Sequence, residues 1–223
     1  MAFISVFDVI GPNMVGPSSS HTAGAASIAL LTKKMIGEKV KRIRFTLYGS
    51  FAQTYKGHGT DRALVGGILG FETDDERIRD SFELAKEAGL DFSFERSEND
   101  DDDIHPNTVD MEVEGFSGRK LYVRGESLGG GKVRLTRING VKVYFTGEFH
   151  ALIVIQRDYP GVVAGVTSVL SNYGVNIAYL RVFREEKGGL AYTIVESDEA
   201  ISEEAVEEMK KNPAIEDIML VRR

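Results

Sequence analysis

The segment 148–223 alternates strand-like and helix-like stretches in an order that leaves few folds open. Apolar or alternating runs predict strands at 150–156, 176–184, 189–197 and 215–221. Apolar residues at helical spacing predict helices at 162–173 and 202–212, and Ser202 is placed to cap the second. The resulting order, strand-helix-strand-strand-helix-strand, is typical of the split βαβ, or ferredoxin-like, arrangement.

Residues 1–147 show a different pattern, which predicts a separate α+β domain. We expect strands at Phe3–Phe7 and 40–48, and helices at 22–36, 50–70 and 74–89. Four antiparallel strands are predicted at 108–113, 119–124, 132–138 and 141–145. The Asn139-Gly140 pair predicts a tight hairpin between the last two. The fold class is therefore α+β, with two domains, 1–147 and 148–223.

Composition excludes several classes of protein. The chain has no cysteine, which excludes disulfides, thiolate nucleophiles, Cys-ligated zinc and thiolate-held iron–sulfur clusters within this chain. Its net charge of −7 disfavours nucleic acid as the main partner. No apolar run approaches the roughly 18 residues of a membrane span. The N-terminus lacks the basic and apolar regions of a secretory signal, so we expect a cytoplasmic protein with no membrane partner.

The densest polar cluster is the stretch GPSSSHT at residues 16–22, directly before a predicted helix. One hydroxyl would be enough to cap the unpaired N–H groups of that helix. Three hydroxyls followed by an imidazole and a threonine exceed this need, and a helix N-terminus of this kind suits a small carboxylate or phosphate. The candidate ligand-binding residues here are Ser18, Ser19, Ser20, His21 and Thr22.

A second cluster is the stretch KGHGTDR at residues 56–62. Glycines on both sides leave the ring of His58 accessible, and Thr60 or Asp61 can cap the helix that follows. The spacing lacks the last glycine of a dinucleotide-binding fingerprint. His58 is a candidate general acid or base, and a purely structural histidine is the alternative.

Two further stretches are HPNT at residues 105–108 and SLGGGK at residues 127–132. Pro106 keeps His105 out of helical geometry, and the amide of Asn107, at the start of a strand, could point into a cleft. Backbone N–H groups around Ser127, Gly129 and Gly130 could cradle an anion, although alone this stretch is only a flexible turn. The acidic run at 100–103 lacks the spacing of a calcium loop, and we predict no metal site.

The element order of 148–223, with Asp158-Tyr159-Pro160-Gly161 and Gly174-Val175-Asn176-Ile177 at its turns, resembles the ACT regulatory domain. The resemblance implies binding of an amino-acid effector where two copies meet. Asp158, Gly161 and Asn176 are the corresponding candidate residues. The alternative is a dimerisation module that binds no effector.

Taken in order, the four polar stretches of the first domain resemble the β chain of the two-chain, iron–sulfur-dependent L-serine dehydratases, over essentially the whole sequence. The first domain is also similar to the allosteric substrate-binding domain of some phosphoglycerate dehydrogenases. The resemblance implies conversion of L-serine into pyruvate and ammonia by loss of water, with a four-iron cluster and without pyridoxal phosphate. An iron would act as a Lewis acid on the departing hydroxyl while a base removes the α-proton.

The resemblance also implies roles for particular residues. Ser18, Ser19 and Ser20 would hold the substrate carboxylate, and His58 or His21 would transfer the proton. Thr60, Asp61 and Asn107 would orient the substrate or the base. The remaining candidate substrate-binding residues are Thr22, His105, Ser127, Gly129 and Gly130.

Because single-chain relatives carry their cluster cysteines in a separate helical domain that is absent here, the resemblance implies a partner. This partner is a cysteine-bearing α chain that holds the 4Fe-4S cluster, and the isolated chain is expected to be inactive.

We also expect a homodimer, through the ACT or the N-terminal domain. One alternative is a purely regulatory subunit whose two domains bind serine or a similar effector. Another is a structural module that only dimerises.

Overall fold

The computed structural model of the chain describes residues 13–98 and 103–223. The predicted strand Phe3–Phe7 and the acidic residues 100–102 lie outside the described residues. The chain divides between Asn139 and Gly140 into two compact units, which are described separately.

The first unit contributes strands β1 to β5 to a six-stranded sheet with the order β2-β1-β3-β4-β5-β6, and β6 follows directly after the division at Asn139. The strands of this sheet are β1 (Val40–Leu47), β2 (Asp91–Arg96), β3 (Thr108–Gly115), β4 (Lys120–Gly129), β5 (Lys132–Ile138) and β6 (Val141–Phe145). β2 runs parallel to β1, whereas the pairs β1–β3, β3–β4 and β4–β5 are antiparallel. The predicted four-stranded meander is confirmed. Asn139 and Gly140 form the expected hairpin turn, with φ angles of 48° and 90°.

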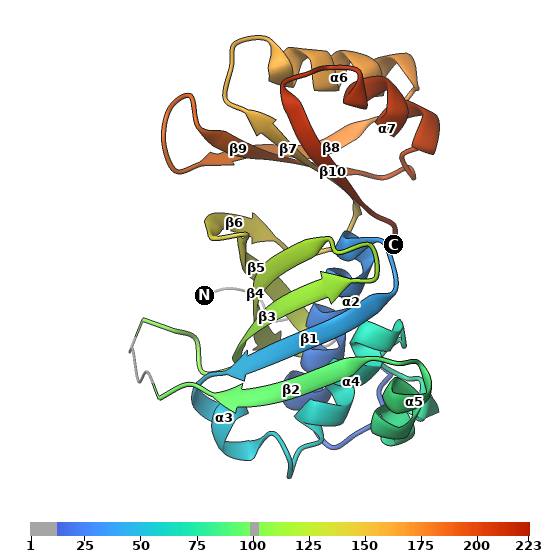
Figure 1. Ribbon diagram of the computed structural model, residues 1–223, viewed down its shortest axis with the longest axis vertical. Coiled ribbons are helices and arrows are strands. Elements are labelled where there is room, and N and C mark those ends of the chain that lie inside the picture. Colours follow the sequence, from blue (N-terminus) through green and yellow to red (C-terminus); the bar gives the residue numbers. More distant parts are fainter. Residues whose placement is uncertain (1–12, 99–102) are drawn as a thin grey trace, which may run out of the picture. The chain divides into compact units, whose positions relative to one another are not determined.

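Helices cover one face of this sheet (Figure 1). They are the π-helical turn η1 (Ser19–Ala23), α2 (Gly24–Ile36), α3 (Gly49–Thr54), α4 (Thr60–Leu69), the 3₁₀ turn η2 (Glu76–Asp80) and α5 (Ser81–Glu87). α2 and α4 approach closely because Gly67 carries no side chain; a Cβ at this position would lie 2.7 Å from the Cβ of Ala29. Large apolar side chains such as Phe45 and Leu64 are fully buried in this unit.

The structure corrects four expectations for the first unit. Residues 50–70 form two helices because Gly59 adopts a φ of 68°, which ends the helical course between α3 and α4. The stretch 74–89 begins as a 3₁₀ turn before α5. Strand β2 was not expected; its Phe94 stacks on Phe45 of β1 with ring centroids 4.9 Å apart. β4 extends to Gly129, so Ser127 lies in a strand and not in a turn.

The second unit contains a four-stranded antiparallel sheet with the order β10-β7-β9-β8 and two helices on one face (Figure 1). Its elements are β7 (His150–Arg157), α6 (Val162–Asn172), β8 (Ile177–Arg184), β9 (Leu190–Ser197), α7 (Glu203–Lys210) and β10 (Ile215–Val221). Leu152, Val166 and Val195 belong to the apolar core of this unit. Ser202 caps α7, accepting the N–H of Ala205 at 3.2 Å. The predicted strand-helix-strand-strand-helix-strand order is confirmed.

Candidate functional site

The polar stretches singled out in the first domain meet at one end of the first sheet. The hydroxyl of Thr22 donates to the carbonyl of His58 at 3.0 Å. The N–H of Ser127 donates to the carbonyl of Asn107, also at 3.0 Å. Gly24 joins these two pairs, because a Cβ on Gly24 would lie 2.7 Å from the Cβ of Ser127. We call residues 18–24, 57–61, 105–108 and 127 the polar cluster.

The serines of the polar cluster surround the start of η1. The Oγ of Ser18 accepts the N–H of His21 at 3.1 Å, and the carbonyl of Ser18 accepts the N–H of Thr22 at 2.8 Å. Within residues 13–98 and 103–223, no partner is found for the backbone N–H groups of Ser19 and Ser20. Three hydroxyls and two N–H groups without a partner in the described residues therefore surround one helix start, an arrangement that suits a small anion.

The ring of His21 is held on both of its nitrogens. Nδ1 lies 3.0 Å from the Oγ of Ser20, and Nε2 lies 2.9 Å from the Oγ of Ser50. Phe51 and His58 both meet the ring edge-on, with centroids 5.3 and 4.8 Å away. Burial, and secondarily the charge of a protonated His58, lowers the pKa of His21 below its ordinary value. His21 is thus an oriented, buried imidazole that favours its neutral form.

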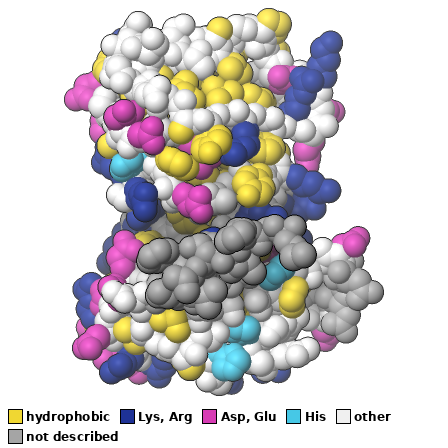
Figure 2. Space-filling view, turned by 180° about the vertical axis from the view of Figure 1, so that it is seen from behind, with side chains coloured by type: hydrophobic (Ala, Val, Ile, Leu, Met, Phe, Trp, Pro, Cys, Tyr) yellow, Lys and Arg dark blue, Asp and Glu magenta, His cyan; other side chains and the backbone are white. Residues whose placement is uncertain are grey.

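His58 lies in the turn between α3 and α4 and has a nitrogen without a partner. Its backbone N–H donates to the carbonyl of Thr54 at 3.1 Å, which fixes the turn. The side chain as a whole is half-buried, but its Nδ1 is shielded from solvent and has no hydrogen-bond partner among the described residues. Figure 2 shows histidine side chains reaching the surface of the first unit. His58 can therefore accept a proton or a hydrogen bond that the chain itself does not supply.

Thr60 and Asp61 begin α4, but neither caps it. The N-cap is Gly59, which makes no side-chain hydrogen bond, so the expected caps are wrong. The positive φ of Gly59 places both residues already inside the helix. The hydroxyl of Thr60 is buried and has no hydrogen-bond partner in the part of the chain that the structure describes. Burial raises the pKa of Asp61, and its carboxylate accepts the N–H of Arg62 at 2.8 Å.

Asn107 and Ser127 lie side by side at the ends of β3 and β4. The amide N–H of Asn107 reaches the carbonyl of Ser127 at 3.5 Å, while its Oδ1 has no partner in the described chain. His105 supports this corner, since its Nδ1 accepts the backbone N–H of Asn107 at 3.2 Å. Gly129 and Gly130 form the turn beyond Ser127 with φ angles of 92° and 61°. A Cβ on Gly129 would meet nothing within 4 Å, so this turn is open around that residue.

Buried polar atoms without partners concentrate in the polar cluster. Seven such atoms are found among the described residues, and four of them lie here: His58 Nδ1, Thr60 Oγ1, Asn107 Oδ1 and Ser127 Oγ. Folded proteins leave few such atoms, because each one costs about 1–3 kcal/mol when it is buried without a hydrogen bond. A bound ligand with several polar groups would remove this cost, so the cluster is a candidate binding site.

Sequence reasoning missed Ser50. It is a single hydroxyl within the short helix α3, and nothing in its neighbours distinguishes it from an ordinary helical serine. Its importance depends on a contact with His21, which lies 29 residues away in the chain. Only the packing of α3 against η1 shows this contact.

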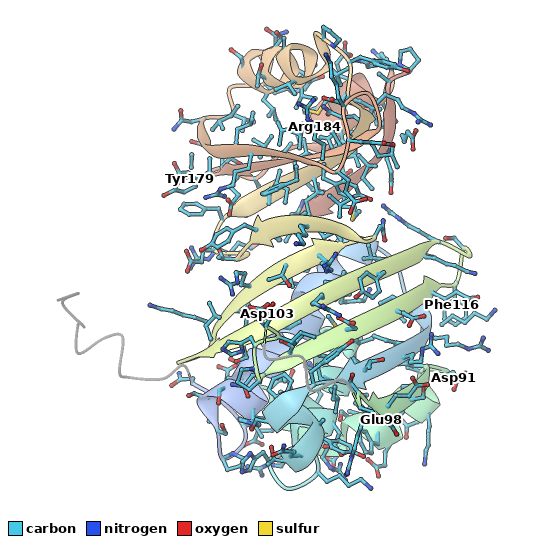
Figure 3. All side chains as sticks on the ribbon, turned by 90° about the vertical axis from the view of Figure 1, so that its left-hand side faces the viewer. Asp91, Glu98, Asp103, Phe116, Tyr179 and Arg184 are labelled. Atoms are coloured by element: carbon cyan, nitrogen blue, oxygen red, sulfur yellow. The ribbon has the colours of Figure 1, made fainter. Side chains whose placement is uncertain are left out.

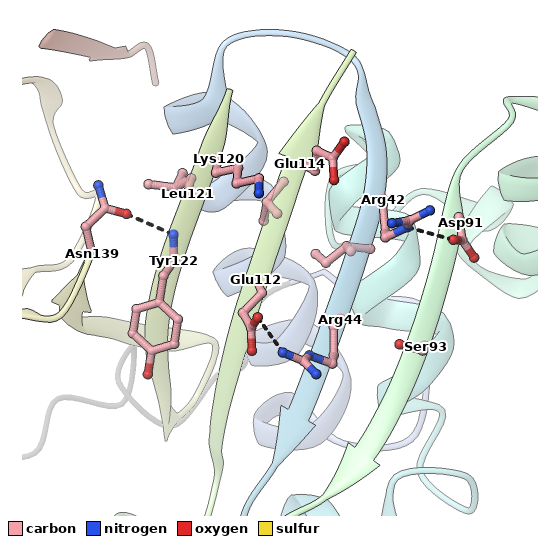
Figure 4. Close-up of a pocket in the computed structure, with 12 residues that line it drawn as sticks. Arg42, Arg44, Asp91, Ser93, Glu112, Glu114, Lys120, Leu121, Tyr122 and Asn139 are labelled. Atoms are coloured by element: carbon pink, nitrogen blue, oxygen red, sulfur yellow. Dashed lines mark hydrogen bonds and ion pairs between the residues drawn. The ribbon is translucent and has the colours of Figure 1, made fainter. Parts of the chain in front are cut away.

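A hollow of about 530 Å³ lies elsewhere, on the face of the first sheet that its helices leave open (Figure 4). Its charges neutralise each other: Arg42 pairs with Asp91 at 2.9 Å, and Arg44 pairs with Glu112 at 2.5 Å. Among its lining residues no buried polar atom lacks a partner. The hollow is therefore a weaker candidate for a binding site than the polar cluster.

Within residues 13–98 and 103–223, no group of three or more His, Asp or Glu side chains could hold a metal ion. The whole sequence has no cysteine, whereas iron–sulfur clusters are held by cysteine thiolates. The residues of this chain therefore do not fit an iron–sulfur cluster.

The predicted effector residues of the second unit lie in two separate places. Asp158 and Gly161 share the turn before α6, whereas Asn176 follows the far end of that helix. Helix α6 has eleven residues and is therefore about 16 Å long, at a rise of 1.5 Å per residue. The Gly188 N–H and the Arg184 guanidinium bind the carboxylate of Asp158 and hold its pKa below the usual range. One copy thus does not bring the three residues together, and their effector role stays a prediction.

Two family models match this sequence. The model described as "Serine dehydratase beta chain" covers residues 5–137, and the ACT domain model covers residues 150–214. The chain belongs to the serine dehydratase beta-chain family. The probable L-serine dehydratase beta chain of Bacillus subtilis is 43% identical over 215 residues, 96% of each chain. The L-serine dehydratase beta chain of Peptoniphilus asaccharolyticus is 44% identical over 203 residues, 91% of each.

A D-3-phosphoglycerate dehydrogenase of Bacillus subtilis is a more distant relative of this chain. It is 26% identical over 204 residues, which make up 88% of this chain and 37% of the dehydrogenase. The expected resemblance to the serine dehydratase beta chain and to the ACT domain is confirmed, whereas the likeness of the first domain to an allosteric substrate-binding domain stays a prediction. The two family models leave residues 138–149 between them, so the domain boundary at 147/148 stays a prediction. No helix of the described residues is long and apolar enough to cross a membrane.

Proposed function

We propose that this chain is the β subunit of an L-serine dehydratase, which converts L-serine into pyruvate and ammonia together with a cysteine-bearing α chain. The observation that carries the proposal is the polar cluster itself. In a chain of this family, it gathers four buried, unpartnered polar atoms around an oriented histidine. A small, highly polar substrate such as serine could satisfy several of these atoms at once.

The start of η1 is the proposed site for the substrate carboxylate. Ser19 contributes its hydroxyl, and Ser19 and Ser20 add backbone N–H groups for which no partner is found in the described residues. The hydroxyls of Ser18 and Ser20 hold this turn through their bonds to each other and to His21. The partial positive charge of the helix start supports an anion at this position. The unpartnered hydroxyl of Ser127, next to Gly24, is within the same corner and is proposed as a further contact.

His58 is the proposed proton acceptor, and His21 is proposed to support it. Both ring nitrogens of His21 already have hydroxyl partners, whereas Nδ1 of His58 has none among residues 13–98 and 103–223. A general base needs a free nitrogen within hydrogen-bond reach of the proton that it removes. Asn107 and Thr60, each with an unpartnered oxygen, are proposed to orient the substrate beside His58.

A 4Fe-4S cluster is assigned by this proposal to the α chain, because this chain has no thiolate that could hold one.

We further propose a homodimer. β8 is an edge strand of the second sheet, and its Tyr179 projects outward and is 49% exposed (Figure 3). An unpaired edge of this kind can pair with a second copy. A dimer through the first domain is the alternative, and a cytoplasmic location stays a prediction.

A purely regulatory role is the second candidate function. It is favoured by the match to a D-3-phosphoglycerate dehydrogenase, whose name denotes a different reaction, over 88% of this chain. An effector pocket for serine would use the same carboxylate contacts as a catalytic one. The two candidates differ in whether any residue of this chain acts on the reacting bonds.

The proposed function is tested by producing the chain together with a cysteine-bearing α chain under anaerobic conditions. We expect the two chains to purify as one brown complex that releases pyruvate and ammonia from L-serine. Iron analysis after separation of the chains should place the metal with the α chain. A stable complex that contains its iron but forms no pyruvate from L-serine would contradict the proposal.

A further inference from the structure

The directions of the hydrogen bonds around His21 single out Ser50. The backbone N–H of His21 can only donate, so the Oγ of Ser18 acts as its acceptor at 3.1 Å. The proton of the Ser18 hydroxyl is then available to donate, either to another residue or to solvent, because Ser18 is half-buried. Within the described residues the Oγ of Ser20, 3.3 Å away, is the partner found for it.

This direction continues through the ring of His21. If Ser20 accepts from Ser18, its own proton is free to donate to Nδ1 of His21, 3.0 Å away. A neutral imidazole with an accepting Nδ1 carries its proton on Nε2. Nε2 then donates to the Oγ of Ser50 at 2.9 Å. If the bonds ran the other way, Ser50 would donate to His21, His21 to Ser20 and Ser20 to Ser18. The hydroxyl proton of Ser18 would then have no acceptor in the described chain.

We propose that Ser50 is a substrate-binding residue: its hydroxyl accepts the Nε2–H of His21 and donates its own proton to the carboxylate of the bound substrate. The inference rests on the proposed function for the identity of that substrate. The Oγ of Ser50 has no other partner in the described chain, and the residue is half-buried, so a ligand in the polar cluster can reach it.

The position of Ser50 is fixed by the residues before it. Gly49 lies against Pro106, where a Cβ would be 2.7 Å from the Pro106 Cα, and its φ of 49° favours glycine. The hydroxyl of Tyr48 donates to Asp110 at 2.8 Å, and Arg124 binds the same carboxylate through two N–H groups. A rigid support of this kind is what a substrate-binding hydroxyl requires.

The first test is independent of activity. The full chain is labelled with ¹⁵N-histidine, and the ring signals of His21 are assigned by comparison with His21→Gln. We expect a neutral ring at pH 7.5 with the proton on Nε2, because burial and the adjacent His58 lower the pKa of His21. A proton on Nδ1, or a charged ring, would overturn the inference even if the assembled enzyme is active.

The second test uses the enzyme assembled with its α chain. Ser50→Ala should raise KM for L-serine by about tenfold or more, as expected for a lost hydrogen bond to a charged group, with a smaller change in kcat. Thr54→Ala is the matched control, because it removes a hydroxyl of the same helix that bonds only the carbonyl of Ser50. An unchanged KM in Ser50→Ala, or an equal rise in both variants, would overturn the inference. An assembled enzyme without any turnover of L-serine would contradict the proposed function, while the ring signals still test His21.

Discussion

Replacing His58 with alanine is expected to lower kcat of the assembled enzyme by about 10²–10⁴-fold, the usual contribution of a general base. The chain should still fold and bind its α chain, because the side chain of His58 is half-buried and its Nδ1 makes no hydrogen bond within the described residues. Steady-state release of pyruvate, together with size-exclusion chromatography of the complex, measures both expectations.

His150→Ala is the matched control for His58→Ala. His150 lies in the second unit, and its Nδ1 accepts the backbone N–H of Arg223 at 3.1 Å. Its replacement should leave kcat unchanged. Wild-type turnover in His58→Ala would remove His58 from the mechanism. A variant that changes only the response to added serine, with kcat intact, would favour the regulatory alternative.

Gly24→Ala is expected to damage both stability and activity. Its Cβ would lie 2.7 Å from the Cβ of Ser127 and would overlap the Ser127 hydroxyl, so α2 and β4 would have to separate. Overpacking of this kind costs about 1–3 kcal/mol in free energy of unfolding. A shift of about 1 Å within a catalytic site can lower kcat/KM by about 10²-fold. Urea unfolding of the chain and kcat/KM of the assembled enzyme measure the two effects.

Gly165→Ala is the control for a glycine that has space around it. A Cβ there would meet only the side-chain nitrogen of Asn212, at 3.8 Å. Gly165 lies inside α6, where alanine should raise the free energy of unfolding by about 0.5–1 kcal/mol.

Adding Ser127→Gly to Gly24→Ala removes the overlapping atoms and should restore stability but not activity. A Gly24→Ala chain as stable as the wild type would contradict the close packing of α2 on β4.

The fold could be predicted where local signals determine it. Gly161 and Gly174, with φ angles of 92° and 70°, bracket α6 at the positions where the sequence places its turns. Asn139-Gly140 marks the hairpin before β6 in the same way. Strand β2 escaped prediction because its pairing with β1 is parallel and distant in sequence. The break between α3 and α4 could not be placed from the sequence, because it depends on the positive φ of Gly59. The glycines of residues 50–70 indicated such a break only weakly.

The candidate site was predictable in its parts but not in its assembly. The hydroxyls of residues 16–22 exceed what helix capping requires, which made Ser18 a candidate from sequence alone, and the glycines around His58 made it a second candidate. That Ser127 lies against Gly24 depends on the packing of β4 on α2, which no local pattern encodes. The role of Ser50 depends likewise on a long-range contact with His21.

The most direct test of the central claim, that this chain needs a companion to supply the metal chemistry, is an assay of the purified chain alone. The chain is freed of metal and incubated with L-serine, and pyruvate is measured before and after anaerobic addition of the α chain. The account predicts no pyruvate above the buffer control from the chain alone, since it has no cysteine to hold a cluster, and steady release after the addition. Enzymatic turnover by the metal-free chain on its own would contradict the account.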